Sequence, residues 1–249
     1  MWVLAALYLL IDIEPIDFSF HIWYTCVIDM KSRKNLLEQL KTLPYFSKDT
    51  VHQLGGQLGL TNTTVDTYIS RFLKFKEIFK LRRELYISAD FYNKNKAEMS
   101  YQFYLANILR KPSYVSSWTA LQYYNLTTES IHGINSVTQK PTRTYDTKIG
   151  SFSYRSIQKE LFSDFSSIDG KFNFFIASPA KALFDLLYFK TRQFRGVKFE
   201  SIRPLIEELR IDIDEMDKSE QDKFYVMIKK YINHEWADSY NIKKKAWWP

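Results

Sequence analysis

The stretch from Leu54 to Phe75, LGGQLGLTNTTVDTYISRFLKF, constrains the fold more than any other part of this chain. Two glycines, a short apolar bridge and a cluster of hydroxyls precede an apolar-periodic segment that ends in Arg and Lys. Because glycine accepts the left-handed conformation of a tight turn, we expect Gly55 and Gly56 to end a helix. Thr61 and Asn62 are N-cap candidates for the next helix. The stretch predicts two helices joined by a turn.

The second of these helices is expected to be amphipathic. Apolar residues recur at helical spacing and form one stripe, which consists of Val65, Tyr68, Ile69, Phe72 and Leu73. The hydroxyl and basic side chains that lie largely off this stripe are Thr63, Thr64, Thr67, Ser70, Arg71 and Lys74. Hydroxyls reach phosphates or base edges, and cations neutralise phosphates and release counterions. This pattern predicts a helix that faces the major groove of double-stranded DNA.

The flanking segments extend the pattern to residues 30–92. Leucines at helical spacing predict a helix closed by Pro44, and Ser47 is a good N-cap for the next helix. Two short apolar segments around Arg83 and Glu84 predict a β-hairpin. From residue 71 to residue 83 there are six cations and one anion, a net charge of +5. We interpret this region as a winged helix-turn-helix whose wing cations contact the DNA backbone or minor groove: Lys80, Arg82 and Arg83.

Two alternatives remain open for this region. It could be a small helical domain with a solvated basic face, or a degenerate winged helix that binds protein and not DNA.

Residues 1–29 are interpreted as a non-native N-terminal extension from a misplaced start codon. The apolar run from Trp2 to Ile11 is about half as long as the roughly 20 residues of a membrane span. No basic residue precedes Lys31, whereas a secretory signal carries one before its apolar core. Met30 opens MKSRKNLLEQL, which is typical of a protein start. The alternatives are a membrane-associated segment, and a short strand and helix that pack on the domain.

Composition and motif content argue against an enzyme. The net charge of +7 favours a polyanionic partner, although an AT-rich genome would explain part of it. The single cysteine, Cys26, excludes a disulfide framework and a cysteine-based metal site, and fits a cytoplasmic protein. The chain has no phosphate loop, dinucleotide fingerprint or nucleophile elbow, so we predict no cofactor and no metal. Asp185, on an apolar helix, is either a buried hydrogen-bonding residue or a catalytic carboxylate, and we favour the first.

Residues 93–249 are predicted to form a second, mixed α/β domain with C-terminal helices, which makes the whole chain α+β. Strands are expected at 134–138, 150–157 and 172–176, and a core helix is expected to start at Ser178-Pro179. The loop between the first two strands carries cations that could add phosphate contacts: Lys140, Arg143 and Lys148. The segment from Glu207 to Asp222 has a net charge of −6, so the chain is basic early and acidic late.

Three ordered segments resemble the AbiEi family of abortive-infection antitoxins. They are SYVSSWTALQYYNLT (113–127), INSVTQKPTRTYDTKIGSFSYRSI (134–157) and FFIASPAKALFDLLYF (174–189), and the resemblance covers roughly residues 31–192. The family often has glycine in the wing turn and glutamate before Lys-Ala-Leu. This chain has Glu84 and Ala180 at those positions.

The resemblance implies a non-enzymatic regulator in a type IV toxin–antitoxin system that acts in phage defence. Its members look like an N-terminal winged helix followed by an antitoxin domain. By resemblance, the protein would bind operator DNA and repress its own operon as a transcriptional regulator. It would also counter a co-encoded nucleotidyltransferase-like toxin without forming a stable complex with it.

Overall fold

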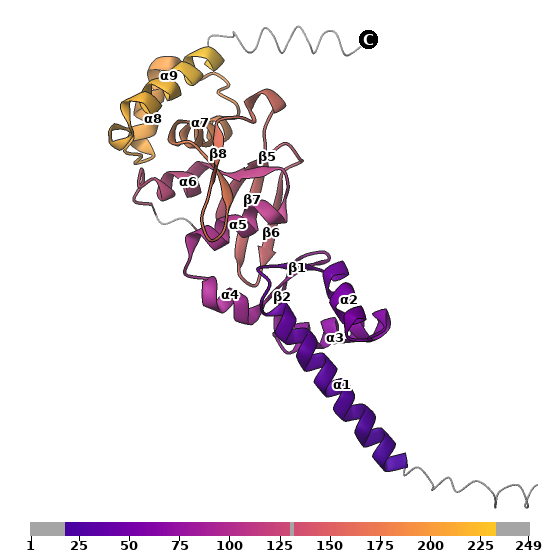
Figure 1. The fold of residues 1–249 in the computed structure, drawn as a ribbon. Helices are drawn as coiled ribbons and strands as arrows, with labels where there is room; N and C mark the ends of the chain where they lie inside the picture. Colours follow the sequence, from indigo (N-terminus) through magenta and orange to yellow (C-terminus); the bar gives the residue numbers. More distant parts are fainter. Residues whose placement is uncertain (1–17, 130–131, 233–249) are drawn as a thin grey trace, which may run out of the picture. The chain divides into compact units, whose positions relative to one another are not determined.

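The computed structural model describes residues 18–129 and 132–232, with side chains described from Asp29 onward. The chain is α+β, as the sequence predicts (Figure 1). Its contacts divide it into two compact units. The first ends at Tyr92 and the second begins at Asn93, except that the hairpin residues 80–83 group with the second unit.

The first unit has the element order helix, strand, helix, helix, strand, strand. The elements are α1 (Phe18–Leu40), β1 (Phe46–Ser47), α2 (Lys48–Gln57), α3 (Asn62–Lys74), β2 (Ile78–Arg82) and β3 (Leu85–Ser88). The three strands form one sheet in the order β1-β3-β2, in which β1 and β3 are antiparallel with Phe46 opposite Tyr86. The order of the helices and the hairpin is the one that the sequence pattern predicts, while the bounds of α1 and α2 differ.

Helix α1 extends upstream of Met30, where the sequence analysis begins the first domain. The helix is continuous from Phe18, and Asp29 accepts a hydrogen bond from the Tyr68 hydroxyl through its backbone carbonyl (3.1 Å). The Tyr68 hydroxyl also donates to the Asp29 carboxylate. Residue 29 is therefore in contact with α3. Residues 1–17, most of the segment interpreted as an extension, lie outside the described residues.

The glycine prediction is wrong in its detail. Helix α2 continues through Gly55 and Gly56 to Gln57, and Gly59 takes the left-handed conformation with φ of 73°. The Leu60 N–H donates to the Gly55 carbonyl and the Gly59 N–H donates to the Gly56 carbonyl, both at 3.0 Å. These two bonds satisfy the last carbonyls of α2 in the Schellman arrangement.

Gly55 is present for packing. A Cβ on this residue would overlap the Cγ2 methyl of Val65 on α3, whereas a Cβ on Gly56 would meet nothing within 4 Å. Gly55 therefore allows α2 and α3 to approach closely, and the local sequence does not show that role.

The core of the first unit joins α1, α2, α3 and the sheet. It contains Leu36, Leu37, Leu40, Phe46, Val51, Val65, Tyr68, Ile69, Phe72, Ile78 and Tyr86. Every member is less than a tenth exposed, and Leu73, the last residue of the α3 stripe, is partly buried against this core. Each buried apolar side chain of this size stabilises the fold by about 1.5–3 kcal/mol relative to exposure.

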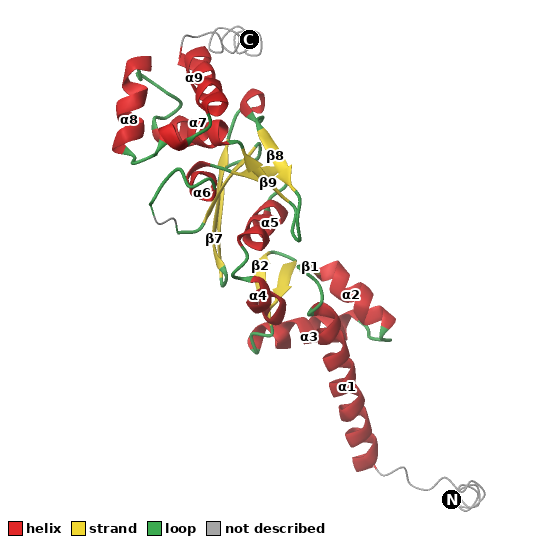
Figure 2. Cartoon of the chain, turned by 60° about the vertical axis from the view of Figure 1, so that its left-hand side comes forward, coloured by secondary structure: helices red, strands yellow, loops and turns green. Residues whose placement is uncertain are grey.

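The second unit surrounds a six-stranded sheet with helices (Figure 2). Helices α4 (Ala89–Asn95) and α5 (Met99–Leu109) come first along the chain. The strands are β4 (Ser113–Val115), β5 (Ile134–Thr138), β6 (Arg143–Thr147), β7 (Gly150–Ser156), β8 (Phe165–Ile168) and β9 (Phe174–Ala177), in the order β6-β7-β5-β4-β9-β8. The remaining helices are α6 (Ser117–Tyr123), α7 (Pro179–Lys190), α8 (Ile202–Glu208) and α9 (Lys218–Ile232).

Side-chain contacts show which helices cover each face of this sheet. The Tyr154 hydroxyl on β7 donates to the Ala106 carbonyl of α5 at 2.6 Å. On the opposite face, the Tyr114 hydroxyl of β4 donates to Asp185 of α7 at 3.0 Å, and Asn135 of β5 bonds Thr119 of α6. The sheet therefore lies between α5 on one side and α6 with α7 on the other.

Helix α7 is the central element predicted from its sequence. Ser178 caps it by accepting from the Lys181 N–H, and Pro179 occupies the first turn, where its missing donor costs nothing. Its residues from Ala180 to Tyr188 are all buried.

The segment expected to be a loop between two strands contains β6. Arg143 begins this strand, which pairs antiparallel with β7 from Arg143 opposite Tyr154 to Thr147 opposite Gly150. The strand lies at the sheet edge and is mostly exposed on both faces, so its sequence lacks the apolar alternation that indicates a strand. Strands β4 and β8 are also absent from the prediction, because each has only three or four residues.

Candidate nucleic-acid interface

Helix α3 separates its buried and exposed faces as the sequence predicts. Val65, Tyr68, Ile69 and Phe72 are buried. The predicted contact residues of α3 that are exposed are Thr63, Thr67, Ser70, Arg71 and Lys74, while Thr64 is half-buried. The spacing of residues 63, 67, 70 and 74 places these four side chains in one line along the helix. Helix α3 therefore presents a polar and basic face that is exposed among the described residues.

A polar clamp fixes α3 against α2. Asp66 on α3 accepts a hydrogen bond from Lys48 Nζ at 2.9 Å, and its second carboxylate oxygen lies 2.7 Å from His52 Nε2. The contact with His52, followed by that with Lys48, holds the pKa of the Asp66 carboxyl below its usual value. With the close approach at Gly55, this clamp sets the angle between the two helices. The sequence analysis misses it, because contacts between residues 14 and 18 positions apart leave no local pattern.

The hydroxyls on the exposed face are partly engaged within the helix. Thr67 donates to the Thr63 carbonyl and Ser70 donates to the Asp66 carbonyl, each at 3.0 Å. Thr64 shares a hydrogen bond with the N-cap Thr61 at 2.9 Å. Among the described residues, the Thr63 hydroxyl has no partner. Thr63 is therefore the hydroxyl best placed to donate to a phosphate without first breaking a bond.

The two cations of α3 differ in their surroundings. Arg71 Nη1 lies 3.5 Å from a carboxylate oxygen of Asp29, and this pair is about half exposed. Within the described part of the chain, Lys74 forms no ion pair.

The Tyr68 hydroxyl stays protonated and so continues to donate to Asp29. Burial, followed by the bond to Asp29, raises the pKa of this hydroxyl to about 12.

The predicted wing cations are exposed on the β2–β3 hairpin. Lys80 and Arg82 alternate with the buried Leu81, so both extend from the same side of β2, an edge strand, and Arg83 lies in the turn. The turn residue Glu84 has φ of 58°, a conformation that favours glycine. The wing therefore has a strained, acidic residue next to its three cations.

The three candidate cations of the second unit do not form one group. Lys140 and Arg143 lie near one end of β6, and the Arg143 guanidinium is 5.0 Å from the Tyr145 ring centroid. Lys148 lies in the turn at the opposite end of that strand. All three are exposed, but Lys148 is separated from the other two by the five-residue strand.

Asp185 is a buried hydrogen-bonding residue. Its carboxylate accepts from Lys181 Nζ at 2.6 Å, Ser116 Oγ at 2.7 Å and the Tyr114 hydroxyl at 3.0 Å. The Lys181 and Asp185 side chains are both fully buried. Burial raises the pKa of the Asp185 carboxyl, and the three donors oppose that rise.

Asp164 and Asp169, two further carboxylates of the second unit, lie at the surface. Asp164 pairs with Lys223 at 3.4 Å, and Asp169 accepts from Ser167 at 3.4 Å. Across residues 29–129 and 132–232, no three His, Cys, Asp or Glu side chains come together as a possible metal site. None of the helices in the described ranges has both the length and the hydropathy of a membrane-spanning helix.

No family model matches the sequence of this chain, and a search of curated proteins finds no match.

Proposed function

We propose that this chain is a cytoplasmic, DNA-binding antitoxin of a type IV abortive-infection system. It would bind operator DNA through a winged helix formed by residues 30–92 and repress its own operon. The observation that carries the proposal is the exposed line of hydroxyl and basic side chains on α3, opposite four buried apolar residues and followed by a basic hairpin. The resemblance of residues 31–192 to the AbiEi family supplies the antitoxin role.

The elements that hold α3 support this proposal. The caps at both helix ends, the Asp66 clamp and the close contact at Gly55 fix α3 before any ligand arrives. A reading helix that is already ordered loses little conformational entropy on binding.

The test is binding to DNA from the region upstream of the chain's own operon, measured by fluorescence anisotropy at several salt concentrations. The double variant Arg71→Ala/Lys74→Ala should bind more weakly. Each phosphate contact contributes about −0.9 to the slope of log affinity against log salt, so the variant's slope should be flatter by about 1.8. The matched control, Lys31→Ala/Lys34→Ala, removes the same charge from exposed positions of α1 in the same unit and should leave both affinity and slope nearly unchanged.

Two results would contradict DNA binding. One is an affinity that does not change between low and moderate salt. The other is an equal loss of affinity in the α3 variant and the α1 control, because binding would then depend on net charge alone.

The antitoxin role is tested separately. Expression with the product of the neighbouring gene, a nucleotidyltransferase-like toxin under this proposal, should restore cell growth. The two proteins should not co-purify, because the proposed antagonism needs no stable complex. Restored growth that requires a stable complex would contradict this part of the proposal.

A protein-interaction module is the second candidate. Three observations favour it: Arg71 already faces Asp29, two hydroxyls of α3 are bonded within the helix, and Glu84 lies in the wing turn. Under this alternative, the acidic segment from residue 207 to residue 222 would bind a basic partner. Co-purification with a neighbouring gene product, without retention on operator DNA, would favour this candidate over the first.

A further inference from the structure

A cavity of about 240 Å³ opens on the β5–β7 face of the large sheet, beside the start of α6 and the end of α7. Asn135, Ser153 and Arg155 line it from the sheet, and Trp118, Phe189 and Lys190 line it from the helices. It lies in the second unit, and none of its lining residues is a predicted DNA-contact residue. We propose that this cavity binds a nucleotide, with its phosphate at Arg155 and Lys190 and its base against an aromatic ring.

The charge of the lining selects for an anion. The cavity is lined by two cations and by no carboxylate. Neither Arg155 nor Lys190 forms an ion pair with a carboxylate in the described residues. The Arg155 guanidinium lies 5.4 Å from the centroid of the Phe189 ring, which restricts its orientation. A planar guanidinium offers two parallel N–H donors that match the geometry of a phosphate.

The polar groups on the sheet face are held in place before a ligand binds. Asn135 and Ser153 lie opposite each other in the parallel β5–β7 pair, and Ser153 Oγ donates to Asn135 Oδ1 at 3.0 Å. The Asn135 amide nitrogen donates to Thr119 Oγ1 of α6 at 3.2 Å. Arg155 follows Ser153 by two residues on β7 and so extends from the same face. Ser153 keeps free acceptor capacity toward ribose hydroxyls.

The aromatic side chains distinguish a nucleotide from a simple anion. Trp118 and Phe189 are half-buried at the cavity, one from each flanking helix. Bases stack on such rings irrespective of their identity. Ser117, which precedes Trp118, has φ of 52°, and backbone strain of this kind in non-glycine residues is concentrated at binding sites. The volume lies just below the ~300–1,000 Å³ typical of pockets for drug-sized ligands, so a single nucleotide is the largest suitable occupant.

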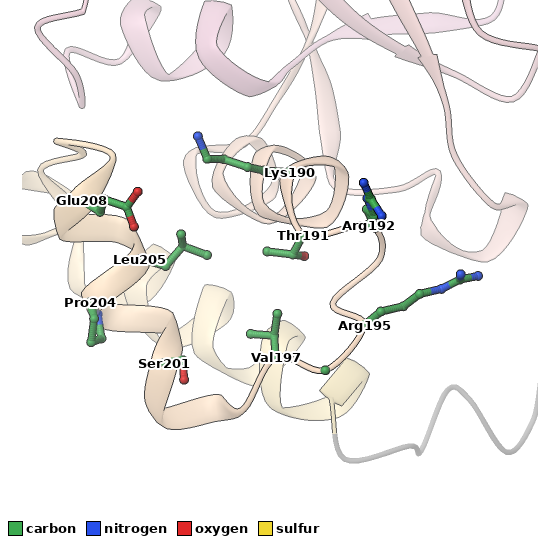
Figure 3. A pocket seen from close by; sticks show the side chains of 10 residues that line it. Lys190, Thr191, Arg192, Arg195, Val197, Ser201, Pro204, Leu205 and Glu208 are labelled. Atoms are coloured by element: carbon green, nitrogen blue, oxygen red, sulfur yellow. The ribbon is translucent and has the colours of Figure 1, made fainter.

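A neighbouring hollow of about 520 Å³ also includes Lys190, but it is less suited to an anion. Three cations line this hollow, and Figure 3 shows Lys190 extending to the left, away from Arg192 and Arg195. Glu208 also lines this hollow. Its cations therefore do not converge, and the proposal is restricted to the smaller cavity.

The test is isothermal titration calorimetry of the full chain with AMP, GMP, inorganic phosphate and adenosine. The nucleotides should bind more tightly than phosphate or adenosine. Arg155→Gln and Lys190→Gln should each weaken nucleotide binding at least about tenfold, which corresponds to about 1.4 kcal/mol. Lys159→Gln, which removes an exposed cation outside the cavity, should leave binding unchanged. Trp118→Ala should weaken nucleotide binding but not phosphate binding.

Several outcomes would overturn the proposal. If adenosine binds as tightly as AMP, the cations do not bind the phosphate. If inorganic phosphate binds as tightly as AMP, the aromatic rings do not bind the base. Loss of nucleotide binding in Arg71→Ala/Lys74→Ala would place the ligand on the first unit. Circular dichroism spectra that match the parent chain show that each variant is folded. Arg155→Lys keeps the positive charge and should bind the nucleotide more tightly than Arg155→Gln does.

The same nucleotide chemistry occurs in free nucleotides and at the ends of nucleic-acid strands. A short single-stranded oligonucleotide with a 5′-phosphate separates these sources. If the oligonucleotide binds more tightly than AMP, and Arg155→Gln abolishes this binding, the ligand is a strand end. Weaker binding identifies it as a free nucleotide.

Discussion

Gly55 and Gly56 are adjacent glycines in α2, and alanine at these two positions should have opposite effects on stability. Both residues are helical, so alanine at either should stabilise α2 by about 1 kcal/mol through helix propensity. At Gly56 the added methyl meets nothing within 4 Å, so that gain should be observed in full. At Gly55 the methyl overlaps Val65 Cγ2, while the Cβ and Cγ1 of Val65 lie at 3.6 and 3.7 Å.

The overlap at Gly55 therefore concerns a single methyl group in a packed core. Inserting a methylene-sized group into such a core costs about 1–3 kcal/mol. Gly55→Ala should then be less stable than Gly56→Ala by about 1–3 kcal/mol. In a Val65→Ala background, which lacks Cγ2, Gly55→Ala should become stabilising by about 1 kcal/mol, as Gly56→Ala is in the parent chain.

Hydrogen exchange followed by mass spectrometry is the appropriate assay. The chain has two units, so a single unfolding transition would mix their stabilities. Peptides covering α2 and α3 report the first unit alone. Equal protection of these peptides in Gly55→Ala and Gly56→Ala would refute the reasoning, and so would a failure of Val65→Ala to change the effect of Gly55→Ala.

Three further predictions concern the Asp66 clamp, the buried Lys181–Asp185 pair and the wing. Asp66→Asn should destabilise α2 and α3 at pH 7. Because the folded pKa of Asp66 is lowered, its stabilisation is present above the ordinary value of 3.8 and is lost as pH falls through the folded pKa. The difference in hydrogen-exchange protection between the parent chain and Asp66→Asn should therefore disappear at acidic pH. Asp185→Asn should cost about 3–5 kcal/mol in the hydrogen-exchange protection of α7 peptides, because it leaves the Lys181 charge buried. Lys181→Met/Asp185→Leu should cost less, and a single variant that is milder than this double variant would contradict the reasoning. Glu84→Gly should raise stability by up to about 1 kcal/mol, because glycine adopts the positive φ of this turn without strain. It should also raise operator affinity, because it removes a negative charge beside the wing cations. Glu84→Gln removes the charge but keeps the strain, so it should raise operator affinity alone.

Features that depend on local chemistry could be predicted from the sequence. Thr61, Ser47 and Ser178 each cap a helix by accepting from the backbone N–H three residues later, because short hydroxyl side chains satisfy free helix donors. The apolar stripe of α3 and the buried α7 also follow from residue spacing and composition. The exposed face of α3 could therefore be predicted.

Features that depend on contacts distant in sequence could not be predicted. Gly55 resembles a helix terminator, but its role depends on Val65, ten residues later. Asp66 is an ordinary polar position of an amphipathic helix until Lys48 and His52 are placed beside it. The row of Asn135, Ser153 and Arg155 depends on the parallel pairing of β5 with β7.

Arg71 is the residue on which the two candidate functions differ most directly. Its partner Asp29 would count against DNA binding if their ion pair were strong, but the pair is about half exposed at 3.5 Å. Exposed pairs contribute about 0–1 kcal/mol, so a phosphate that also releases counterions competes successfully for the guanidinium. The internal bonds of Thr67 and Ser70 are similarly weak obstacles, because each hydroxyl exchanges one acceptor for another by rotation. Asp29→Asn should therefore raise operator affinity modestly if α3 reads DNA and leave binding to a protein partner unaffected.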